Sequence, residues 1–282
     1  MGDTAIPGEL VQLEPLVARV LAPNPSPFTF TGTHSHLIGT DHLAIIDPGP
    51  DDDAHLSALL AAIGERSLRA IVCTHTHRDH SPLARRLSEQ TGAPVIGCAP
   101  LAFDGEGGEA FDAGYWPDMV LADGARVAGS NWTIEAVATP GHTSNHLSYA
   151  LIETGALFSG DHVMGWSTSI VSPPDGDMGD YMASLDRLLT RADRVYYPAH
   201  GDPVADPHAR VAELIAHRRA REAAIVAMLG EGVGEPRALV ERIYAGTPPA
   251  LFPAAERSVL AHLIDLDRRG LARGDGGTWR LA

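Results

Sequence analysis

Hydrophobic positions in the first two hundred residues alternate between short apolar runs and mixed stretches with helical signals. The runs "HLAIID" and "LRAIVC" have the length and β-branched content of buried strands. Between them, "PGPDDDAHLSALLAAIGE" predicts a helix that is entered through an acidic first turn. The segment "PLARRLSEQTG" predicts a shorter helix with Ser81 as N-cap, Pro82 at the first helical position and Gly92 at its end.

Strands and helices continue to alternate from residue 93 onward, with a Gly-rich loop around Gly105 to Gly114 after the first of these strands. One further helix is expected in "DYMASLDRLL". The further strands are expected in "APVIGCA", "DMVLADGARV", "WTIEAVATP", "LSYALIE", "ALFSGD" and "RVYYPAHG". This order predicts an α/β layered domain over residues 1–205, with polar loops leaving the strand ends.

From about Asp206 the pattern changes, because "HARVAELIAHRRAREAAIVAML" predicts a long amphipathic helix rich in arginine. Two more helices, in "PRALVERIYA" and "ERSVLAHLIDLDRRG", precede a hairpin in "LARGDGGTWRL". That order predicts a winged-helix-like domain over residues 206–282. Three acids interrupt the helix that would enter a nucleic-acid groove, so we expect a packing or dimerisation module, which leaves a homodimer open.

Charge is distributed unevenly between these two parts. The chain has 282 residues, 21 Arg, 36 Asp plus Glu and a net charge of -15, and it contains no lysine. Residues 206–282 hold 11 Arg and 10 acids, so the first 205 hold 10 Arg and 26 acids, a net charge of -16. This balance disfavours a polyanionic partner.

The N-terminus and the cysteines bear on the compartment. The stretch "MGDTAIPGELVQLEP" has neither a basic start nor a continuous apolar segment, so it predicts no signal peptide and no membrane anchor. Cys73 and Cys98 are too few for a disulfide framework, and their spacing does not suit a thiolate metal site. We therefore expect a cytoplasmic protein with no membrane partner.

The stretch "THTHRDHSP" places three histidines and an aspartate directly behind the apolar run "AIVC". His75 and His77 are two apart on an extended segment, so both side chains can leave on one side. If the chain turns at Arg78, Asp79 and His80 point toward a second position nearby, and one stretch can serve two metal ions. A lone histidine is more often structural, but four such groups in six positions would crowd one another without a cation. Imidazole and carboxylate are ligands that zinc prefers.

Three later residues supply the further ligands that a two-metal site needs. They are His142 in "TPGHTSNH", Asp161 in "FSGDHVMG" and His200 in "YYPAHGD". Each follows an expected strand and lies among Gly or Pro, where the backbone can bend to aim a side chain. Any one of them alone is more typical of a turn residue, but together with the first motif they give seven donors for two ions.

At these residues the sequence closely resembles the metallo-β-lactamase-fold superfamily, whose H-x-H-x-D-H signature matches His75 to His80 at every position. The resemblance covers about residues 28–203 and implies a four-layered αβ/βα sandwich with two Zn²⁺ ions, iron or manganese being the alternatives at one or both positions. The ligand sets that it implies are His75, His77 and His142 for one ion and Asp79, His80 and His200 for the other, with Asp161 as the bridging carboxylate.

Two adjacent zinc ions share a water molecule and lower its pKa to about 7, which gives a metal-bridging hydroxide at neutral pH. One metal also stabilises the oxyanion that develops on the substrate. The candidate catalytic residues are Asp79, His142 and His200. Asp79 has two alternative roles, as a metal ligand and as the acceptor that orients the proton of the nucleophile.

Further histidines are expected near the same strand ends. Candidates for substrate binding are His34, His36, His146 and His162, with supporting contacts to the ligands, proton donation to the leaving group or a structural role as alternatives. Asp47 in "IIDPG" forms a turn or supports a ligand, and we favour the turn. Surface positions are expected for His55, His208, His217 and His262.

The phrases "NPSPFTFTGTHSHLIG", "GDHVMGWSTSIVSPP", "YMASLDRL", "YPAHGDPV" and "HRRARE" narrow the resemblance. They are similar to the lactamase-beta-like group, which ends in a small winged-helix-like domain. That group includes animal endoribonucleases acting on single-stranded RNA and fungal thioesterases that release polyketides from carrier protein. His34 and His36 depart from its usual Asn and Tyr.

The acidic catalytic part favours cleavage of a small or medium ester or thioester over cleavage of single-stranded RNA, which is the alternative. The carboxylate at Asp161 and the absence of an export signal disfavour β-lactam hydrolysis. A mononuclear iron enzyme of the persulfide dioxygenase type is also less favoured, because the second ligand set is complete.

Overall fold

The computed structural model describes residues 5–101 and 110–282, so residues 105–109 of the expected loop at 105–114 lie outside the described residues. By its contacts the chain forms two compact units. The first comprises residues up to 138 with 145–167 and 192–207, and the second comprises 139–144, 168–191 and 208–282. The expected domain boundary after residue 205 stays a prediction.

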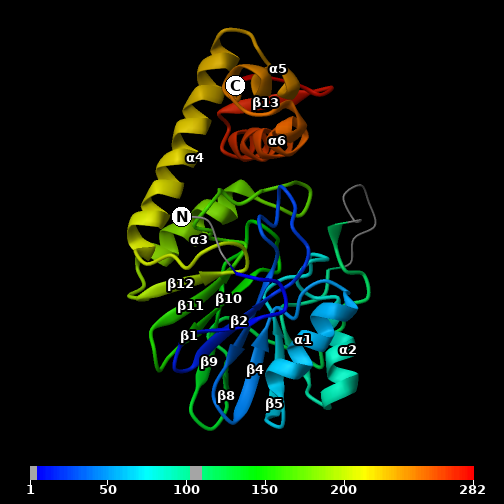
Figure 1. The fold of residues 1–282 in the computed structure, drawn as a ribbon. Helices are drawn as coiled ribbons and strands as arrows, with labels where there is room; N and C mark the ends of the chain where they lie inside the picture. The colour runs from blue at the N-terminus through cyan, green and yellow to red at the C-terminus, as the bar shows by residue number, and fades with distance from the viewer. Residues whose placement is uncertain (1–4, 102–109) are drawn as a thin grey trace. The chain divides into compact units, whose positions relative to one another are not determined.

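The first unit contains two β-sheets (Figure 1). The seven-stranded sheet has its strands in chain order: β1 (Leu10–Glu14), β2 (Val17–Leu21), β3 (His34–Ile38), β4 (His42–Ile46), β5 (Ser67–Cys73), β6 (Val95–Gly97) and β7 (Met119–Val120). The first four strands pair antiparallel, and β4 to β7 pair parallel. Because these parallel strands run in one direction, the loops that follow them leave from one edge of the sheet.

The second sheet of this unit has five strands in the order β12-β11-β10-β9-β8. These are β8 (Arg126–Ala128), β9 (Thr133–Ala138), β10 (Leu147–Leu151), β11 (Ala156–Gly160) and β12 (Val195–Pro198). The single strand expected over "DMVLADGARV" is wrong, because the chain turns at Asp123 and Gly124, where Gly124 has φ +77°. Its two ends become β7 and β8, which belong to different sheets.

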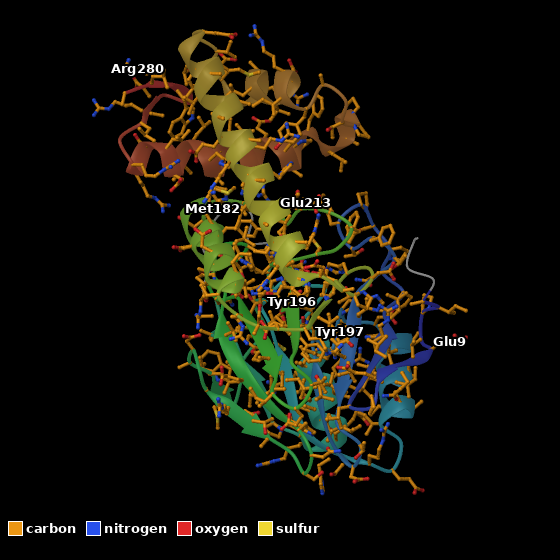
Figure 2. All side chains as sticks on the ribbon, turned by 90° about the vertical axis from the view of Figure 1, so that its left-hand side faces the viewer. Glu9, Met182, Tyr196, Tyr197, Glu213 and Arg280 are labelled. Carbon is orange, nitrogen blue, oxygen red and sulfur yellow. The ribbon has the colours of Figure 1, made fainter. Side chains whose placement is uncertain are left out.

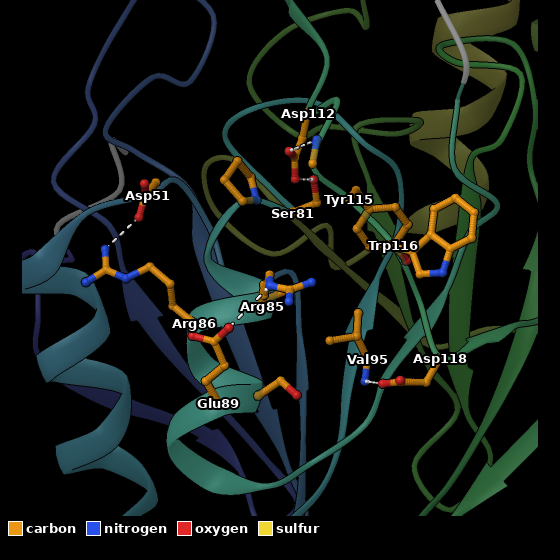
Figure 3. Close-up of a pocket in the computed structure, with 14 residues that line it drawn as sticks. Asp51, Ser81, Arg85, Arg86, Glu89, Val95, Asp112, Tyr115, Trp116 and Asp118 are labelled. Atoms are coloured by element: carbon orange, nitrogen blue, oxygen red, sulfur yellow. Dashed lines mark hydrogen bonds and ion pairs between the residues drawn. The ribbon is translucent and has the colours of Figure 1, made fainter.

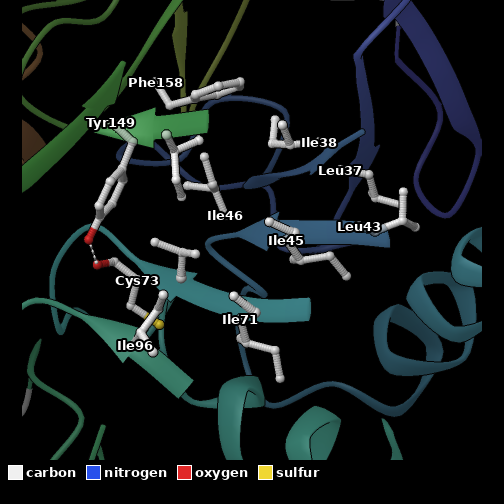
Figure 4. Close-up of a cluster of buried hydrophobic side chains, with 14 of the residues drawn as sticks. Leu37, Ile38, Leu43, Ile45, Ile46, Ile71, Cys73, Ile96, Tyr149 and Phe158 are labelled. Atoms are coloured by element: carbon white, nitrogen blue, oxygen red, sulfur yellow. Dashed lines mark hydrogen bonds between the residues drawn. The ribbon is translucent and has the colours of Figure 1, made fainter. Parts of the chain in front are cut away.

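The core of the first unit lies between the two sheets and beneath two helices. Figure 4 shows Phe158 and Tyr149 of the second sheet facing Ile38 and Ile46 of the first. The Tyr149 hydroxyl donates to the carbonyl oxygen of Cys73 at 2.8 Å. Tyr196 and Tyr197 of β12 are both buried as well (Figure 2). Packing of the two sheets in this way fixes the positions of the strand ends that the candidate donors follow.

Two helices, α1 (Asp53–Ile63) and α2 (Leu83–Thr91), add apolar side chains to this core. The acidic start of α1 is confirmed, since the Asp52 carboxylate caps the helix by accepting from the backbone N–H of His55 at 2.7 Å. The N-cap expected at Ser81 is wrong. Pro82 occupies that position without a side-chain cap, because the Ser81 hydroxyl donates instead to the Asp112 carboxylate at 2.8 Å.

The second unit contains the remaining helices and a hairpin: α3 (Met178–Leu189), α4 (Pro207–Gly230), α5 (Pro236–Ile243), the 3₁₀ helix η2 (Pro249–Leu251), α6 (Phe252–Arg268), β13 (Ala272–Asp275) and β14 (Thr278–Leu281). A small apolar core, which includes Ile225, Leu239 and Leu263, joins α4, α5 and α6. Arg280 of the hairpin points outward (Figure 2). The expected order of helix, helix and terminal hairpin is therefore present. None of the helices described is long and apolar enough to cross a membrane.

Candidate metal centre

The loop after β5 carries four of the candidate donors, and its backbone turns as expected. The N–H of His80 donates to the carbonyl oxygen of His77 at 3.0 Å, which closes a turn around Arg78. The backbone N–H of Arg78 is held by the carbonyl oxygen of Ala110 at 3.0 Å, and its Nε donates to the carbonyl oxygen of Phe111 at 3.1 Å. The turn separates the donors into two pairs that face different positions.

One group of donors combines His75 and His77 with Asp161, which follows β11. One donor atom from each of these residues lies within 4.8 Å of the others. Nε2 of His75 is 2.9 Å from Nδ1 of His77, so both imidazoles address the same point, as their spacing predicted. This is a geometry that could hold one cation.

A second group combines Asp79 and His80 with His200, which follows β12, and its donor atoms again lie within 4.8 Å of one another. Nε2 of His200 is 3.3 Å from the Asp79 carboxylate and 3.2 Å from Oδ1 of Asp161. Nε2 of His80 is 3.5 Å from each of the same carboxylates. Asp161 therefore borders both groups, which is the place expected of a bridging carboxylate.

Hydrogen bonds on the far side of the rings orient His80 and His200. Nδ1 of His80 lies 3.0 Å from the Asp47 carboxylate, which also accepts from the backbone N–H and the hydroxyl of Thr74 at 2.7 and 2.8 Å. Nδ1 of His200 donates to the carbonyl oxygen of Gly32 at 3.0 Å. Each ring therefore presents Nε2 to the donor groups. Asp47, expected as a turn former, has a positive φ of +51° directly after β4, and its carboxylate orients His80.

Charges in this buried cluster are strongly coupled. Burial opposes ionisation of Asp79 and Asp161, but the imidazoles of His80 and His200 outweigh it and hold both carboxyl pKa values well below the usual range. Burial likewise opposes charge on His80, yet Asp79, Asp161 and Asp47 hold its pKa well above 6.5. For His200 burial again opposes charge, but the carboxylates of Asp161 and Asp79 raise the pKa to about 10. Nearby positive charge therefore stabilises the ionised carboxylates, and either protons on the imidazoles or a metal ion can supply it.

The donor set fits a metal ion. Nε2 of His80 and Nε2 of His200 are buried, and neither makes a hydrogen bond of normal geometry with a described residue. A buried polar atom without such a bond is costly unless something else satisfies it. Histidine nitrogen and carboxylate oxygen are also the donors that borderline divalent cations prefer. The cluster is therefore suited to metal binding.

His142, the remaining expected ligand, lies on the segment 139–144, which belongs to the second unit. Its Nδ1 donates to the carbonyl oxygen of Ile170 at 2.6 Å. That hydrogen bond makes Nε2 the acceptor nitrogen of the ring, the form that binds metals. Its membership of the donor set stays a prediction.

Arg19 supports the turn that carries His200, and sequence reasoning missed it. Its guanidinium donates to Nε2 of His34 at 3.2 Å and to the carbonyl oxygen of Gly201 at 3.4 Å. The backbone N–H of His34 donates to the carbonyl oxygen of Ala199 at 2.7 Å. The available signal was an arginine inside the apolar run "LVARVLA". His34 is fully buried, so this position suits support of the turn better than contact with a substrate.

His36 is also buried, with its ring centroid 5.1 Å from that of Phe158 and 5.9 Å from that of Tyr197. Burial lowers its pKa well below 6.5, and the neighbouring His34 and Arg19 lower it further. A neutral ring packed between two sheets is the structural alternative considered for this residue. A role in substrate binding has no support in these contacts.

His146 and His162 lie beside the first donor group. The ring of His146 has its centroid 5.1 Å from that of His75, and its Nε2 accepts from the backbone N–H of Asp161 at 3.3 Å. His162 is buried with its ring 5.8 Å from that of His146. Both border the candidate site, and contact with a substrate stays a prediction for each.

Two of the four histidines expected at the surface are buried. His55 lies in the first turn of α1 with Nε2 2.9 Å from the Ser35 hydroxyl, and burial lowers its pKa to about 4. His262 of α6 is 2% exposed. The surface expectation was therefore wrong for these two, whereas His208 is exposed and His217 is half-buried.

A separate hollow of about 420 Å³ lies along α2 and contains none of the candidate donors (Figure 3). Its lining includes the hydrogen-bonded pair Ser81 and Asp112 and the indole of Trp116, which is 77% exposed. Arg86 at its edge is paired with Asp51 at 2.6 Å. We therefore place the candidate site at the donor cluster and leave this hollow outside it.

Comparison with known proteins decides the family. Residues 28–200 match the family model described as "Metallo-beta-lactamase superfamily". The chain belongs to the metallo-beta-lactamase superfamily. Residues 236–279 match the "Beta-lactamase associated winged helix domain", so the expected C-terminal winged helix is confirmed. The α/β fold class is confirmed with it.

Relatives within the superfamily cover most of the chain. It is 32% identical over 270 residues to "Beta-lactamase-like protein 2 homolog" of Caenorhabditis elegans, which spans 92% of this chain and 87% of the relative. It is 31% identical to "Atrochrysone carboxyl ACP thioesterase" of Claviceps purpurea, over 79% of this chain and 68% of that protein. A beta-lactamase domain protein from Burkholderia ambifaria has the same fold, with a TM-score of 0.84, 22% identity and coverage of 99% and 96%.

Superfamily membership makes the chain a metallo-hydrolase with a histidine and aspartate cluster suited to metal binding. The donor motif found in the sequence is therefore on the fold that the resemblance implied. Which metal binds, and how many ions, are questions for the proposal that follows.

Proposed function

We propose that the protein is a dinuclear zinc hydrolase that cleaves the carbonyl carbon–sulfur or carbon–oxygen bond of an acyl thioester or ester. The observation that carries the proposal is the pair of donor groups bordered by one carboxylate, Asp161. A site for a single ion would leave the second group, Asp79, His80 and His200, as buried charges facing one another. Two cations compensate both groups at once.

In the proposed arrangement His75, His77 and His142 hold one ion, Asp79, His80 and His200 hold the other, and Asp161 contacts both. A pair of zinc ions there would polarise a substrate carbonyl and lower the pKa of a shared water to about 7. Asp47 and the carbonyl oxygen of Gly32 keep Nε2 of His80 and of His200 aimed at the donor groups.

Asp79 is the candidate for handling the proton of the nucleophile. Its side chain is 26% exposed, whereas those of His80 and His200 are 0% and 1% exposed. One carboxylate oxygen, Oδ2, faces the imidazoles, so the other is available to accept a proton on the solvent side. The carboxyl pKa is held well below its usual range by those imidazoles, although burial opposes this, so Asp79 is ionised at neutral pH.

Two observations favour a thioester or ester over single-stranded RNA. The first is similarity to proteins named as thioesterases, at 31–33% identity. The second is charge, since residues 1–205 carry 10 Arg and 26 acids and no lysine, a balance that repels a polyanion.

Turnover by the zinc-loaded protein tests this proposal. The panel consists of acyl thioesters, acyl esters, a β-lactam, bis-p-nitrophenyl phosphate and short single-stranded RNA, with the metal content of each preparation measured. We expect two zinc ions per chain and turnover of the acyl substrates. Cleavage confined to RNA and the phosphodiester would support the nuclease alternative, and one iron per chain without zinc would overturn the dinuclear zinc site.

A further inference from the structure

An aromatic pair stands beside the turn that carries His200. The rings of Phe30 and Trp166 stack with centroids 4.8 Å apart and planes 19° from parallel. Trp166 is 37% exposed, and Phe28, two residues before Phe30, is 52% exposed. Exposed aromatic surface of this kind on a well-defined loop is typical of a place where a ligand binds.

The Trp166 indole and the loop that carries Phe30 both contact the segment around His200. A Cβ added at Gly201, the residue after His200, would lie only 2.8 Å from Cδ1 of Trp166, so the indole rests directly on that backbone. Gly32, two residues after Phe30, accepts the hydrogen bond from Nδ1 of His200 at 3.0 Å. The aromatic pair is therefore positioned by the same contacts that orient a candidate metal donor.

The backbone of Phe30 is strained. Among the described residues only Phe30 and Asp47 have positive φ without being glycine, at +56° and +51°. Bulky residues rarely adopt this conformation, and it occurs most often where function requires a side chain in one place. Asp47 already illustrates this, because its carboxylate orients His80. The strain at Phe30 indicates that its ring position is likewise required.

Hydrogen bonds hold the loop of Phe30 in this conformation. The side chain of Asn24 accepts from the backbone N–H of Thr33 at 2.9 Å and donates to the Thr33 hydroxyl at 2.9 Å. The hydroxyls of Ser26 and Thr29 are 2.8 Å apart. These hydrogen bonds fix the conformation of the loop. The ring of Phe30 is therefore held in place before any ligand binds.

We propose that Phe30 and Trp166 form a subsite for a planar aromatic acyl group of the substrate. A third flat ring extends a near-parallel stack favourably, and preorganised rings lose little entropy when they bind it. Trp166 contacts Gly201, the residue after His200, so an aromatic group bound there would place its thioester carbonyl near that donor. This inference rests on the proposed function and names its substrate class.

Calorimetric titration of the zinc-loaded protein with 2-naphthoate tests the subsite without turnover. We expect Trp166→Ala to weaken binding about tenfold, since a lost stacking partner is worth about one such factor. Trp116→Ala is the matched control, because Trp116 is exposed but lines the separate hollow, and it should leave the affinity unchanged. Equal affinity for the wild-type protein and Trp166→Ala would overturn the proposal.

Phe30→Gly gives a second, independent variant, because glycine adopts φ +56° without strain and lacks the ring. For this variant and Trp166→Ala, hydrolysis of 2-naphthoyl and acetyl thioesters of N-acetylcysteamine is compared. We expect a fall of about tenfold in kcat/KM for the naphthoyl substrate, mostly through KM, and little change for the acetyl substrate. Equal losses for both substrates, with zinc content and thermal unfolding unchanged, would contradict a subsite.

The two proposals fail in different ways. If the wild-type protein hydrolyses no thioester, the proposed function fails, and the titration with 2-naphthoate still decides whether the aromatic pair binds a planar ring. If thioesters are hydrolysed with no dependence on Phe30 or Trp166, the hydrolase stands and the subsite is overturned.

Discussion

The buried histidines of the donor cluster in the first unit and His262 in the second have opposite pKa shifts, although burial opposes protonation in both places. In the first unit His80 and His200 face the carboxylates of Asp79 and Asp161, which raise the histidine pKa values against burial, to about 10 for His200. These imidazoles hold positive charge until a cation replaces their protons. Whether a buried histidine can belong to a cation site is therefore decided by the charges of its neighbours and not by burial itself.

His262 in the second unit shows the opposite case. Burial lowers its pKa to about 3, and the cations Arg218, Arg269 and Arg221 and the neighbouring His217 add to the effect. Both of its ring nitrogens are buried, and neither has a hydrogen-bond partner among the described residues. It is therefore a neutral packing residue on α6, and no metal would be attracted to its positive surroundings.

The largest expected effect is on the cluster in the first unit. His80→Ala removes an imidazole between two carboxylates, and we expect at least one bound zinc to be lost and turnover to fall more than about 100-fold, beyond the loss typical of changes outside the ligand shell. Zinc content per chain and hydrolysis of an acyl thioester measure this. His262→Leu is the matched control, and an unchanged zinc content in His80→Ala would remove that residue from the site.

Asp47→Asn should have the next largest effect, because it weakens the hydrogen bond that orients His80 while keeping the shape of the side chain. We expect zinc affinity to fall about 10–100-fold, as for other changes to partners of metal ligands. Competition with a fluorescent chelator measures the affinity. A control is Asp52→Asn, whose carboxylate caps α1 and contacts no candidate donor. Equal zinc affinity in both variants would show that orientation of His80 does not need Asp47.

The lowered pKa of His262 in the second unit predicts how the stability of the protein depends on pH. Because the pKa of His262 is about 3 in the fold and about 6.5 when unfolded, the unfolded chain binds the extra proton between these values. Stability from this residue is complete above about pH 6.5 and falls as the pH decreases toward 3, by roughly 3 kcal/mol at pH 4. Denaturant unfolding of the wild-type protein and His262→Leu from pH 7 to 4 measures it. The variant should lose less stability, and parallel curves would contradict the assignment.

The smallest effect is expected at Asp177, the N-cap of α3. Its carboxylate accepts from the N–H of Asp180 at 3.0 Å and pairs with Arg268, and these contacts lower its pKa although partial burial opposes them. Asp177→Ala should destabilise the protein by about 1 kcal/mol at pH 7. The difference should shrink below about pH 4, because the carboxyl of the unfolded chain takes up a proton there while the folded one stays ionised. Urea unfolding at pH 7 and 3.5 tests this, and an equal difference at both would argue against a charged cap.

The first motif could be predicted from sequence because its donors are local. A strand followed by a turn fixes where His75, His77, Asp79 and His80 point relative to one another. The partners that orient them are distant in sequence, so Asp47 and Arg19 were undervalued or missed. Their roles depend on which strands become neighbours, and that is set by the pairing of the whole sheet.

Other errors had local signals that were not weighed. His262 lies on the same helical stripe as Val259, Leu263 and Leu266, a spacing of three and four residues that predicts burial. The Asp-Gly pair at 123–124 marks the turn that divides β7 from β8. Ser81 could not be judged from sequence, because its hydroxyl is taken by Asp112, 31 residues away.

The hydrogen bond from Tyr149 to the Cys73 carbonyl ties the second sheet to the end of β5, two residues before His75. Burial raises the pKa of this phenol well above 10, so the bond does not dissociate in alkaline solution. Donors that follow the first sheet and donors that follow the second are therefore kept at a fixed distance from one another. This holds over the whole pH range in which a hydrolase of this kind would work.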